Sequence, residues 1–354
     1  MNPRGGIEQP LGAVLSVRDL HVEFPTDDGL VKAVDGLSYD VYPNEVLGIV
    51  GESGSGKSVS SLAILGLLPR RARVRGQILY RGRDLLQLPE RELLKLRGES
   101  IAMVFQDALA ALNPVYTVGA QIAEAVNVHH PELSKGELRT RAIDLLELVG
   151  TPNPSKRVDN YPHEFSGGMR QRAMIAMALS NDPDVLIADE PTTALDVTIQ
   201  AQVLDVIERV QERTNSAIVL ITHDLGVVAG VADRVMVMYA GRQAEMATVD
   251  EVFYDTRHPY TLGLLASLPR LDQDAEGMRL HRIKGQPPSL IDVPPGCPFH
   301  PRCEFRKLPD PCATQIPPSR PMENAEHLSA CHFAETLRDT QPEDLQPVAK
   351  DVSA

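Results

Sequence analysis

The sequence predicts an α/β fold with a largely parallel sheet, preceded by antiparallel β-structure and followed by a small irregular extension that contains cysteines. Three short apolar runs are typical of strands that are buried on both faces of a sheet: residues 45–50, 184–189 and 217–222. Segments with helical periodicity separate these runs, and such alternation is typical of a parallel sheet. The proline-rich segment 285–321 cannot hold long regular elements.

The first predicted elements are antiparallel strands that lead to a strand, a loop and a helix. The stretches LSVRDLHVEF and TDDGLVKAVDGLSYDVYP alternate apolar and polar residues around Gly and Asp turn signals, which favours antiparallel strands. The apolar run 45–50 then enters the glycine-rich GESGSGKS, and the apolar VSSLAILGLL follows. This order predicts a buried strand, a tight loop and a helix.

The later elements continue the alternation. Residues 116–150 are predicted to be mainly helical, because the stretch AIDLLELVG has apolar side chains at i, i+3, i+4 and i+7 and ends at Gly150. A further helix is predicted over about 196–213, and a hairpin is predicted to turn at Gly241. The expected division is a main domain, a C-terminal extension and a mobile tail, over residues 1–250, 251–333 and 334–354.

The composition is that of an ordinary globular protein. Of the 354 residues, 43% are hydrophobic and 23% are charged, and no apolar run approaches the ~18 residues that a membrane span needs. The first residues, MNPRGGIEQPLGAV, lack the apolar core of a signal peptide, so we expect a protein of the cytosol. The net charge of −13 argues against binding to nucleic acid backbones, so we expect no nucleic acid partner.

Residues 51–58 fit the P-loop pattern G-x-x-x-x-G-K-S and lie in the required place between a strand and a helix. The backbone N–H groups of such a loop form a concave anion site, and the helix N-terminus adds its dipole. Lys57 supplies positive charge to the β- and γ-phosphates of a nucleotide, and the Ser58 hydroxyl is expected to bind Mg²⁺. The residues expected to bind the nucleotide here are Gly51, Ser53, Gly54, Ser55, Gly56, Lys57, Ser58 and Val59.

The stretch VLIADEP places Asp189 and Glu190 at the end of a predicted buried strand. An Asp in this place can hold the Mg²⁺ of a P-loop nucleotide site. The adjacent Glu can accept a proton from an attacking water. An exposed acidic turn is the alternative interpretation of the pair, and a P-loop alone does not separate kinases, GTPases and motor ATPases.

Four further motifs, together with the P-loop, resemble those of ABC-type ATPases. The stretch FSGGMRQR resembles the signature motif, while FQD, TALD and ITHD are similar to the Q-loop, D-loop and H-loop. The resemblance covers about residues 14–250. It implies a RecA-like core with an N-terminal antiparallel β subdomain, and a helical subdomain at about 107–165.

The resemblance also implies roles for particular residues. Two such domains would form a head-to-tail dimer in which Ser166, Gly167 and Gly168 contact the ATP held by the other subunit's P-loop. Phe24 matches the adenine-stacking aromatic by position, with a buried core Phe as the alternative. The catalytic residues implied are Glu190, His223, Lys57 and Gln106. Asp196, in the D-loop, is a further nucleotide contact, and the Mg²⁺ ligands implied are Ser58, Gln106 and Asp189.

The amino-acid sequence in and around these motifs is similar to that of the ATPase subunits of peptide importers, particularly in GIVGESGSGKS and HPYTLGLLASLP. This branch implies ATP hydrolysis that powers import of di- and oligopeptides. It implies a second, homologous ATPase subunit, two membrane permeases and an extracytoplasmic solute-binding protein, at the cytoplasmic face of the cell membrane. Ala108 stands where the family usually has Pro. Importers of nickel or glutathione, and ABC ATPases that act on nucleic acid or ribosomes, are the alternatives.

All four cysteines fall near the end of the chain: Cys297, Cys303, Cys312 and Cys331. Their spacing lacks the close C-x2-C pairs of structural zinc sites and is not a ferredoxin spacing, so the spacing leaves unrelated thiols and a metal site both open. The resemblance implies a 4Fe-4S cluster held by these four residues. Zn²⁺ is the alternative, with His300 or His332 replacing a thiolate.

Overall fold

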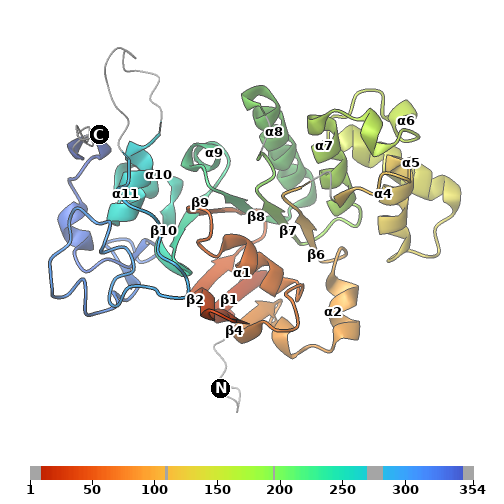
Figure 1. Cartoon of the computed structure of the whole chain (residues 1–354). Helices are drawn as coiled ribbons and strands as arrows, with labels where there is room; N and C mark the ends of the chain where they lie inside the picture. Colours follow the sequence, from red (N-terminus) through yellow and green to blue (C-terminus); the bar gives the residue numbers. More distant parts are fainter. Residues whose placement is uncertain (1–8, 108–110, 194–195, 269–281, 346–354) are drawn as a thin grey trace.

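The computed structural model describes residues 9–107, 111–193, 196–268 and 282–345, and these residues form two sheets with helices around them (Figure 1). Ala108 lies outside the described residues. The strands are β1 (Leu15–Thr26), β2 (Gly29–Val41), β3 (Val46–Val50), β4 (Arg73–Tyr80), β5 (Arg83–Asp84), β6 (Ile101–Val104), β7 (Val185–Asp189), β8 (Ala217–Thr222), β9 (Arg234–Tyr239), β10 (Arg242–Thr248), β11 (Arg320–Pro321) and β12 (Leu328–Ser329).

The smaller sheet is antiparallel and has the strand order β2-β1-β4-β5. Strand β1 pairs with β2 on one side and with β4 on the other, so that Val17 lies opposite Tyr39 and Ile78. These three side chains are buried in one apolar core with the interior face of the second sheet. The structure therefore confirms the antiparallel strands that alternation predicts for the start of the chain.

The larger sheet has the strand order β11-β12-β10-β9-β3-β8-β7-β6. Strands β9, β3, β8, β7 and β6 are parallel, and every residue of β3, β7 and β8 is buried. Continuous apolar runs are expected for strands covered on both faces, and the three runs in the sequence form these three strands. The predicted hairpin joins β9 to β10 through Ala240 and Gly241, which both have positive φ as a tight hairpin turn requires.

The helices divide into a group beside the parallel sheet and a group that stands apart from it. In Figure 1, α4, α5, α6 and α7 gather at the upper right, beyond β7 and β6, while α10 and α11 lie at the left beside β10. The helices are α1 (Lys57–Ile64), α2 (Glu90–Leu96), α4 (Val118–Asn127), α5 (Lys135–Leu148), α6 (Pro154–Arg157), α7 (Gly167–Ala178), α8 (Val197–Thr214), α9 (Leu225–Ala229), α10 (Val249–Tyr254) and α11 (Pro259–Ala266), with short 3-10 helices at Leu85–Gln87, Pro162–Glu164, Ala334–Leu337 and Pro342–Asp344.

Side-chain caps fix where several of these helices begin. Thr117, Ser134 and Ser166 accept hydrogen bonds from backbone N–H groups in the first turns of α4, α5 and α7. Asp196 does the same for α8, by accepting from the Ile199 N–H at 3.0 Å. Such caps stabilise a helix by about 1 kcal/mol, so these four polar residues stabilise the first turns of α4, α5, α7 and α8.

The C-terminal region packs onto the far edge of the larger sheet. Strand β12 pairs with β10, so that Ser329 lies opposite Glu245. Glu245 is fully buried, and its Oε1 lies 2.9 Å from Nε2 of His327 and accepts the Arg257 backbone N–H at 2.6 Å. The rings of Tyr239, Tyr260 and Phe299 pack together with centroids 4.7–5.3 Å apart. Over the residues that the structure covers, no helix has both the length and the apolar character needed to span a membrane.

Candidate functional site

The P-loop joins β3 to α1 with a backbone that only glycine tolerates at several points. Gly54 and Gly56 have φ of 79° and 101°, in the region that glycine adopts readily. A Cβ on Gly51 would lie 2.3 Å from the backbone oxygen of Met238, and one on Gly56 would lie 2.2 Å from that of Ala33. The loop is therefore packed closely between β9 and β2, which fixes the shape of the predicted anion site.

Lys57 begins α1 and folds back over the loop. Its Nζ donates hydrogen bonds to the backbone oxygens of Gly51 at 2.6 Å and Glu52 at 3.0 Å. Burial lowers the pKa of Lys57, while the nearby carboxylates of Glu190, Asp189 and Glu52 act in the opposite direction. The ammonium thus lies at the centre of the loop, with acidic groups on the side where a nucleotide would bind. Val59, two residues further on, is partly buried and packs against the core.

Ser58 and Asp189 meet although they are 131 residues apart in the chain. The Ser58 hydroxyl donates a hydrogen bond to Oδ1 of Asp189 at 3.0 Å. Burial raises the pKa of Asp189, and this hydrogen bond opposes the rise. One hydroxyl and one carboxylate are oxygen donors of the kind that Mg²⁺ uses beside nucleotide phosphates. These two residues therefore fit the predicted Mg²⁺ site.

Glu190 is the point on which three other side chains converge. Its Oε2 accepts a hydrogen bond from Nε2 of Gln106 at 2.9 Å and another from the hydroxyl of Thr193 at 2.7 Å. Nδ1 of His223 lies 3.5 Å from the same oxygen. Glu190 itself has φ of 48°, a left-handed conformation that is uncommon outside glycine. The structure thus brings together Glu190, Gln106 and His223 from three separate motifs.

Thr193 is a member of this group that the sequence analysis did not select. It lies three residues after Glu190, and its backbone N–H donates to the Glu190 carbonyl oxygen at 3.2 Å in a tight turn. That turn returns the Thr193 hydroxyl to the Glu190 carboxylate. The spacing of an acidic residue and a Thr three positions later is the signal that could have found it.

The signature residues lie apart from the P-loop of the same chain. Ser166 and Gly167 are exposed at the start of α7, in the group of helices at the upper right of Figure 1, whereas α1 lies below the parallel strands. Gly168 is buried, and a Cβ there would lie 2.6 Å from Cγ2 of Ile199 in α8. Asp196 caps α8 close to this contact. These residues form a second surface, separate from the one around Lys57.

Phe24 lies on β1 directly opposite Val31 of β2. Its ring is partly buried and packs against the core that the two sheets share. The side chain therefore has both a core contact and an exposed part, and its stacking on adenine stays a prediction.

The prediction of a metal site at the cysteines is wrong. Cys297, Cys303, Cys312 and Cys331 do border one small cavity, together with His300 and His332. Across residues 9–107, 111–193, 196–268 and 282–345, however, no group of three or more His, Cys, Asp or Glu side chains is placed to hold a metal ion. This finding overturns both the iron-sulfur cluster and the zinc alternative.

The surroundings of the cysteines give a physical reason. Burial raises the pKa of Cys303 and of Cys331 to about 12, and it also raises the pKa of Cys297. A metal binds the thiolate, and burial among apolar groups favours the neutral thiol instead. Phe299, Phe305 and Leu337 line the same cavity, so the cysteines here form part of an apolar cluster.

The C-terminal region also reaches the P-loop, which the sequence did not predict. Arg302 forms a two-point ion pair with Glu52, at 2.6 and 3.0 Å, and its side chain is only 5% exposed. The Glu52 backbone N–H donates to the Tyr260 hydroxyl at 2.9 Å. Two residues from beyond position 250 thus hold the second residue of the loop.

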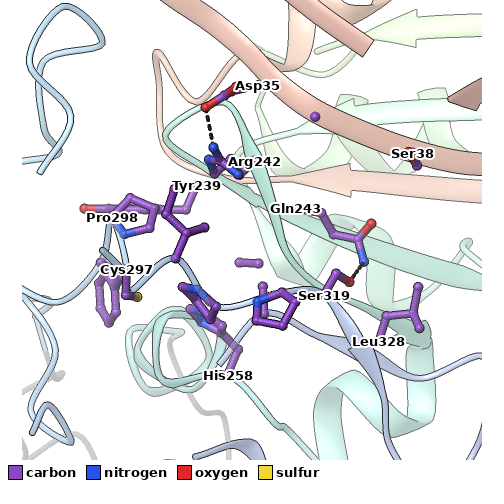
Figure 2. A pocket seen from close by; sticks show the side chains of 17 residues that line it. Asp35, Ser38, Tyr239, Arg242, Gln243, His258, Cys297, Pro298, Ser319 and Leu328 are labelled. Carbon is purple, nitrogen blue, oxygen red and sulfur yellow. Dashed lines mark hydrogen bonds and ion pairs between the residues drawn. The ribbon is translucent and has the colours of Figure 1, made fainter. Parts of the chain in front are cut away.

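A separate cavity of about 380 Å³ lies between the β9–β10 hairpin and the C-terminal region, and Figure 2 shows the side chains around it. Arg242 pairs with Asp35 at 2.5 Å, and Nε2 of Gln243 donates to the Ser319 hydroxyl at 3.1 Å. Four of its polar side chains thus pair within the lining, and the cavity shares no lining residue with the group around Glu190.

Comparisons with solved structures agree with this fold. The dimeric structure of a bacterial ABC transporter cassette superposes with a TM-score of 0.60 at 24% identity, and it covers 66% of this chain and 98% of that one. A protein of Clostridium perfringens that is part of the ABC transporter complex cbiONQ gives a TM-score of 0.59 at 30% identity, and it covers 68% and 91% of the two chains.

Comparisons of sequence identify the branch of the ABC transporter family to which the chain is similar. The model for ABC transporters matches residues 34–193, and the model for the C-terminal region of oligopeptide/dipeptide transporters matches residues 244–312. The dipeptide transport ATP-binding protein DppD of Bacillus subtilis is 52% identical over 90% of this chain and 94% of its own length. The oligopeptide transport ATP-binding protein OppD of Escherichia coli is 51% identical over 84% and 87%.

The OppD protein of Mycobacterium tuberculosis is also 51% identical and matches 96% of this chain, but the chain spans only 55% of its length. All three of these relatives are named as transport ATP-binding proteins. The P-loop, the group around Glu190 and the matched C-terminal region agree with that description. The chain belongs to the ABC transporter family of ATP-binding subunits, in its oligopeptide/dipeptide branch.

Proposed function

We propose that this chain is the ATP-hydrolysing subunit of a membrane transporter that imports di- and oligopeptides. The observation that carries the proposal is the convergence of Gln106, Thr193 and His223 on Glu190, which directly follows Asp189, the partner of Ser58 in the P-loop. The relatives that are about half identical over most of the chain are named as oligopeptide or dipeptide transport proteins.

The residues have distinct tasks in this mechanism. The backbone N–H groups of the P-loop and the ammonium of Lys57 bind the phosphates of ATP. Ser58 and Asp189 would hold Mg²⁺, with Gln106, which donates a hydrogen bond to the adjacent Glu190, as the third ligand, and the ion would neutralise phosphate charge. Glu190 accepts the proton of the attacking water, and His223 fixes the position of the groups around that water. Catalysis therefore consists mostly of placement and of charge stabilisation.

The remaining part of each ATP site comes from a second ATPase subunit. Ser166 and Gly167 lie exposed at the N-terminus of α7, where backbone N–H groups and the helix dipole favour an anion. In a head-to-tail pair this surface faces the γ-phosphate bound to the other subunit. The P-loop of this chain then faces the corresponding helix of its partner.

The transporter also contains two membrane permeases and an extracytoplasmic solute-binding protein, and this chain binds the permeases at the cytoplasmic face of the membrane. A groove of about 420 Å³ that is lined in part by Phe105, the neighbour of Gln106 in the chain, supports this arrangement. It is lined by apolar side chains of the core and of the helical group, including Phe105 and Met174. Phe105 is 42% exposed there. We assign the groove to a cytoplasmic helix of a permease, since movement of that helix against Phe105 would be passed to Gln106, the next residue in the chain.

The substitution Glu190→Gln tests the proposal. It removes the proton acceptor but keeps the shape and the hydrogen-bonding capacity of the side chain. ATP hydrolysis by the complex purified with its permeases should fall roughly 10²- to 10⁴-fold, while ATP binding persists. Peptide uptake into vesicles that contain the complex should stop.

The exposed Glu208 of α8 provides a matched control. Glu208→Gln makes the same chemical change away from the site and should leave hydrolysis and uptake unchanged. Hydrolysis at the normal rate in the Glu190→Gln complex would contradict the assignment of Glu190. Stimulation of hydrolysis by nucleic acid, and not by peptide with its binding protein, would contradict the transport function.

A further inference from the structure

A cavity of about 430 Å³ lies directly beside the P-loop and is closed on one side by the C-terminal region. Residues 52–55 of the loop form one wall, and Val31 and Ala240 lie next to them. The opposite wall is the segment 287–291, whose sequence is PPSLI. Figure 1 shows the chain after residue 282 passing beside β2. A region outside the motifs of the ATP site thus borders the space next to the phosphate-binding loop.

The segment is held in place by contacts with β2 and by its own turn. The Lys32 N–H donates to the carbonyl oxygen of Leu290 at 3.0 Å. Cγ2 of Ile291 lies 3.0 Å from the point where a Cβ on Gly29 would stand, so this position on β2 needs glycine. The Asp292 N–H donates to the Ser289 carbonyl oxygen at 3.1 Å, which closes a turn. Contacts within the chain therefore hold this wall against β2.

Phe24 connects this cavity with the expected place of a nucleotide base. Phe24 and Val31 lie directly opposite each other on β1 and β2, and directly opposite residues of an antiparallel pair project to the same face. Val31 lines the cavity, so the ring of Phe24 is on the side of the sheet that faces it. A ligand with its phosphates on the P-loop would extend its base toward these two side chains.

The chemistry of the two walls differs in the way that a nucleotide requires. Backbone N–H groups of the P-loop suit the phosphates, whereas Val31, Pro288 and Ile291 present apolar surface that suits a flat base. Ile291 is 41% exposed, so part of its apolar surface is open to contact with a ligand.

We propose that residues 287–291 form a wall of the nucleotide-base site and that the Ile291 side chain contacts the base of ATP. The C-terminal region then takes a direct part in ATP binding. This inference rests on the proposed ATP binding, and it adds a contact that the P-loop, Phe24 and the signature residues do not supply.

The substitution Ile291→Ala in the full chain tests the inference by isothermal titration calorimetry with Mg²⁺. The Kd for ATP should rise roughly fivefold, since part of one apolar contact is lost. The Kd for inorganic tripolyphosphate, which has no base, should stay within about twofold of the wild type. Val31→Ala, on the opposite side of the cavity, should produce the same selective loss.

Ile316→Ala is the matched control, because Ile316 is also exposed in the C-terminal region but does not line this cavity. It should leave both Kd values unchanged. An unchanged Kd for ATP in Ile291→Ala would overturn the inference, as would an equal loss for ATP and tripolyphosphate. Failure of the wild-type chain to bind ATP would instead contradict the proposed function, on which the inference depends.

Discussion

Glu190 combines an uncommon backbone conformation with a crowded carboxylate. A non-glycine residue in the left-handed region costs roughly 1 kcal/mol or more, and such strain persists where the surrounding contacts hold it. Here the Glu190 N–H donates to the Ile221 carbonyl oxygen at 2.9 Å, which ties the strained residue to the neighbouring strand. The conformation turns the side chain toward Gln106 and His223 and away from Asp189, so adjacent acidic residues can serve different tasks.

Much of this group could be predicted from the sequence at the level of single residues. Lys57, Asp189 and Glu190 are recognisable because each follows an apolar strand in a short pattern with a known chemical use. Thr193 was missed because its contribution depends on the turn that Glu190 makes, and a positive φ at Glu190 is not visible in the sequence. For the four cysteines, the sequence correctly predicts that they lie together, but it wrongly predicts a metal site. It does not show that apolar side chains surround them.

The raised pKa values of Cys303 and Cys331 predict how fast these two thiols react. The pKa of Cys303 and Cys331 is raised to about 12 by burial, so their thiolate fraction is very small at neutral pH and grows about tenfold per pH unit below 12. Alkylation of both residues by iodoacetamide at pH 7.5 should be slow in the folded chain and should become fast in guanidinium. Mass spectrometry of digested samples over time measures each residue. Equal rates in the folded and unfolded chain would contradict the protonated state of these two thiols.

Two contacts link elements of the C-terminal region to the P-loop. Arg302 and Glu52 are 250 residues apart, and Tyr260 of α11 holds the backbone of the same Glu52. The proline-rich sequence correctly predicts few regular elements in this region, where only the short β11 and β12 form between 282 and 333. It could not predict where the region packs, because contacts over such distances depend on the finished fold and leave no local pattern.

We expect the Arg302→Met substitution to lower the free energy of unfolding by roughly 2 kcal/mol, because it leaves a partly buried Glu52 without its cation. Glu52→Gln alone should also destabilise the chain, and the double variant should recover part of the loss. Urea unfolding followed by circular dichroism gives the coupling energy of the pair, expected at about 1–2 kcal/mol.

Arg338→Met removes an exposed ion pair with Glu323 in the same region and is the control, with an expected change of less than about 0.5 kcal/mol. Additive effects of the two substitutions at Arg302 and Glu52, with no coupling, would show that the ion pair does not fasten the C-terminal region to the loop.

Considered as a whole, the molecule has two separate surfaces that are expected to meet ATP. One surrounds Lys57 at the start of α1, and the other is the exposed start of α7, which Figure 1 shows among a different group of helices. The first surface has the P-loop and the acidic residues, and the second has the exposed Ser166 and Gly167 of the signature motif. This separation is what the proposed head-to-tail pairing requires, in which each ATP is held between two chains.

The substitution Ser166→Arg tests this division. A large cation at the start of α7 should block the approach of the partner and lower ATP hydrolysis by the assembled complex by roughly 100-fold. ATP binding by the chain alone should stay unchanged, because its own P-loop is untouched. Ser155→Arg, at an exposed position of α6 in the same group of helices, is the control and should keep normal hydrolysis. Normal hydrolysis in Ser166→Arg would contradict the shared site.

The pairing of β12 with β10 also has a consequence for the order in which the chain folds during synthesis. Glu245 leaves the ribosome 82 residues before His327, the buried partner of its carboxylate, and 84 residues before Ser329, its neighbour in the sheet. Until then the outer edge of β10 has unpaired backbone groups and a carboxylate that no folded structure covers. The motifs of the ATP site are complete by residue 224, but the outer edge of the sheet that supports them is covered only when the later segment Leu328–Ser329 has been translated.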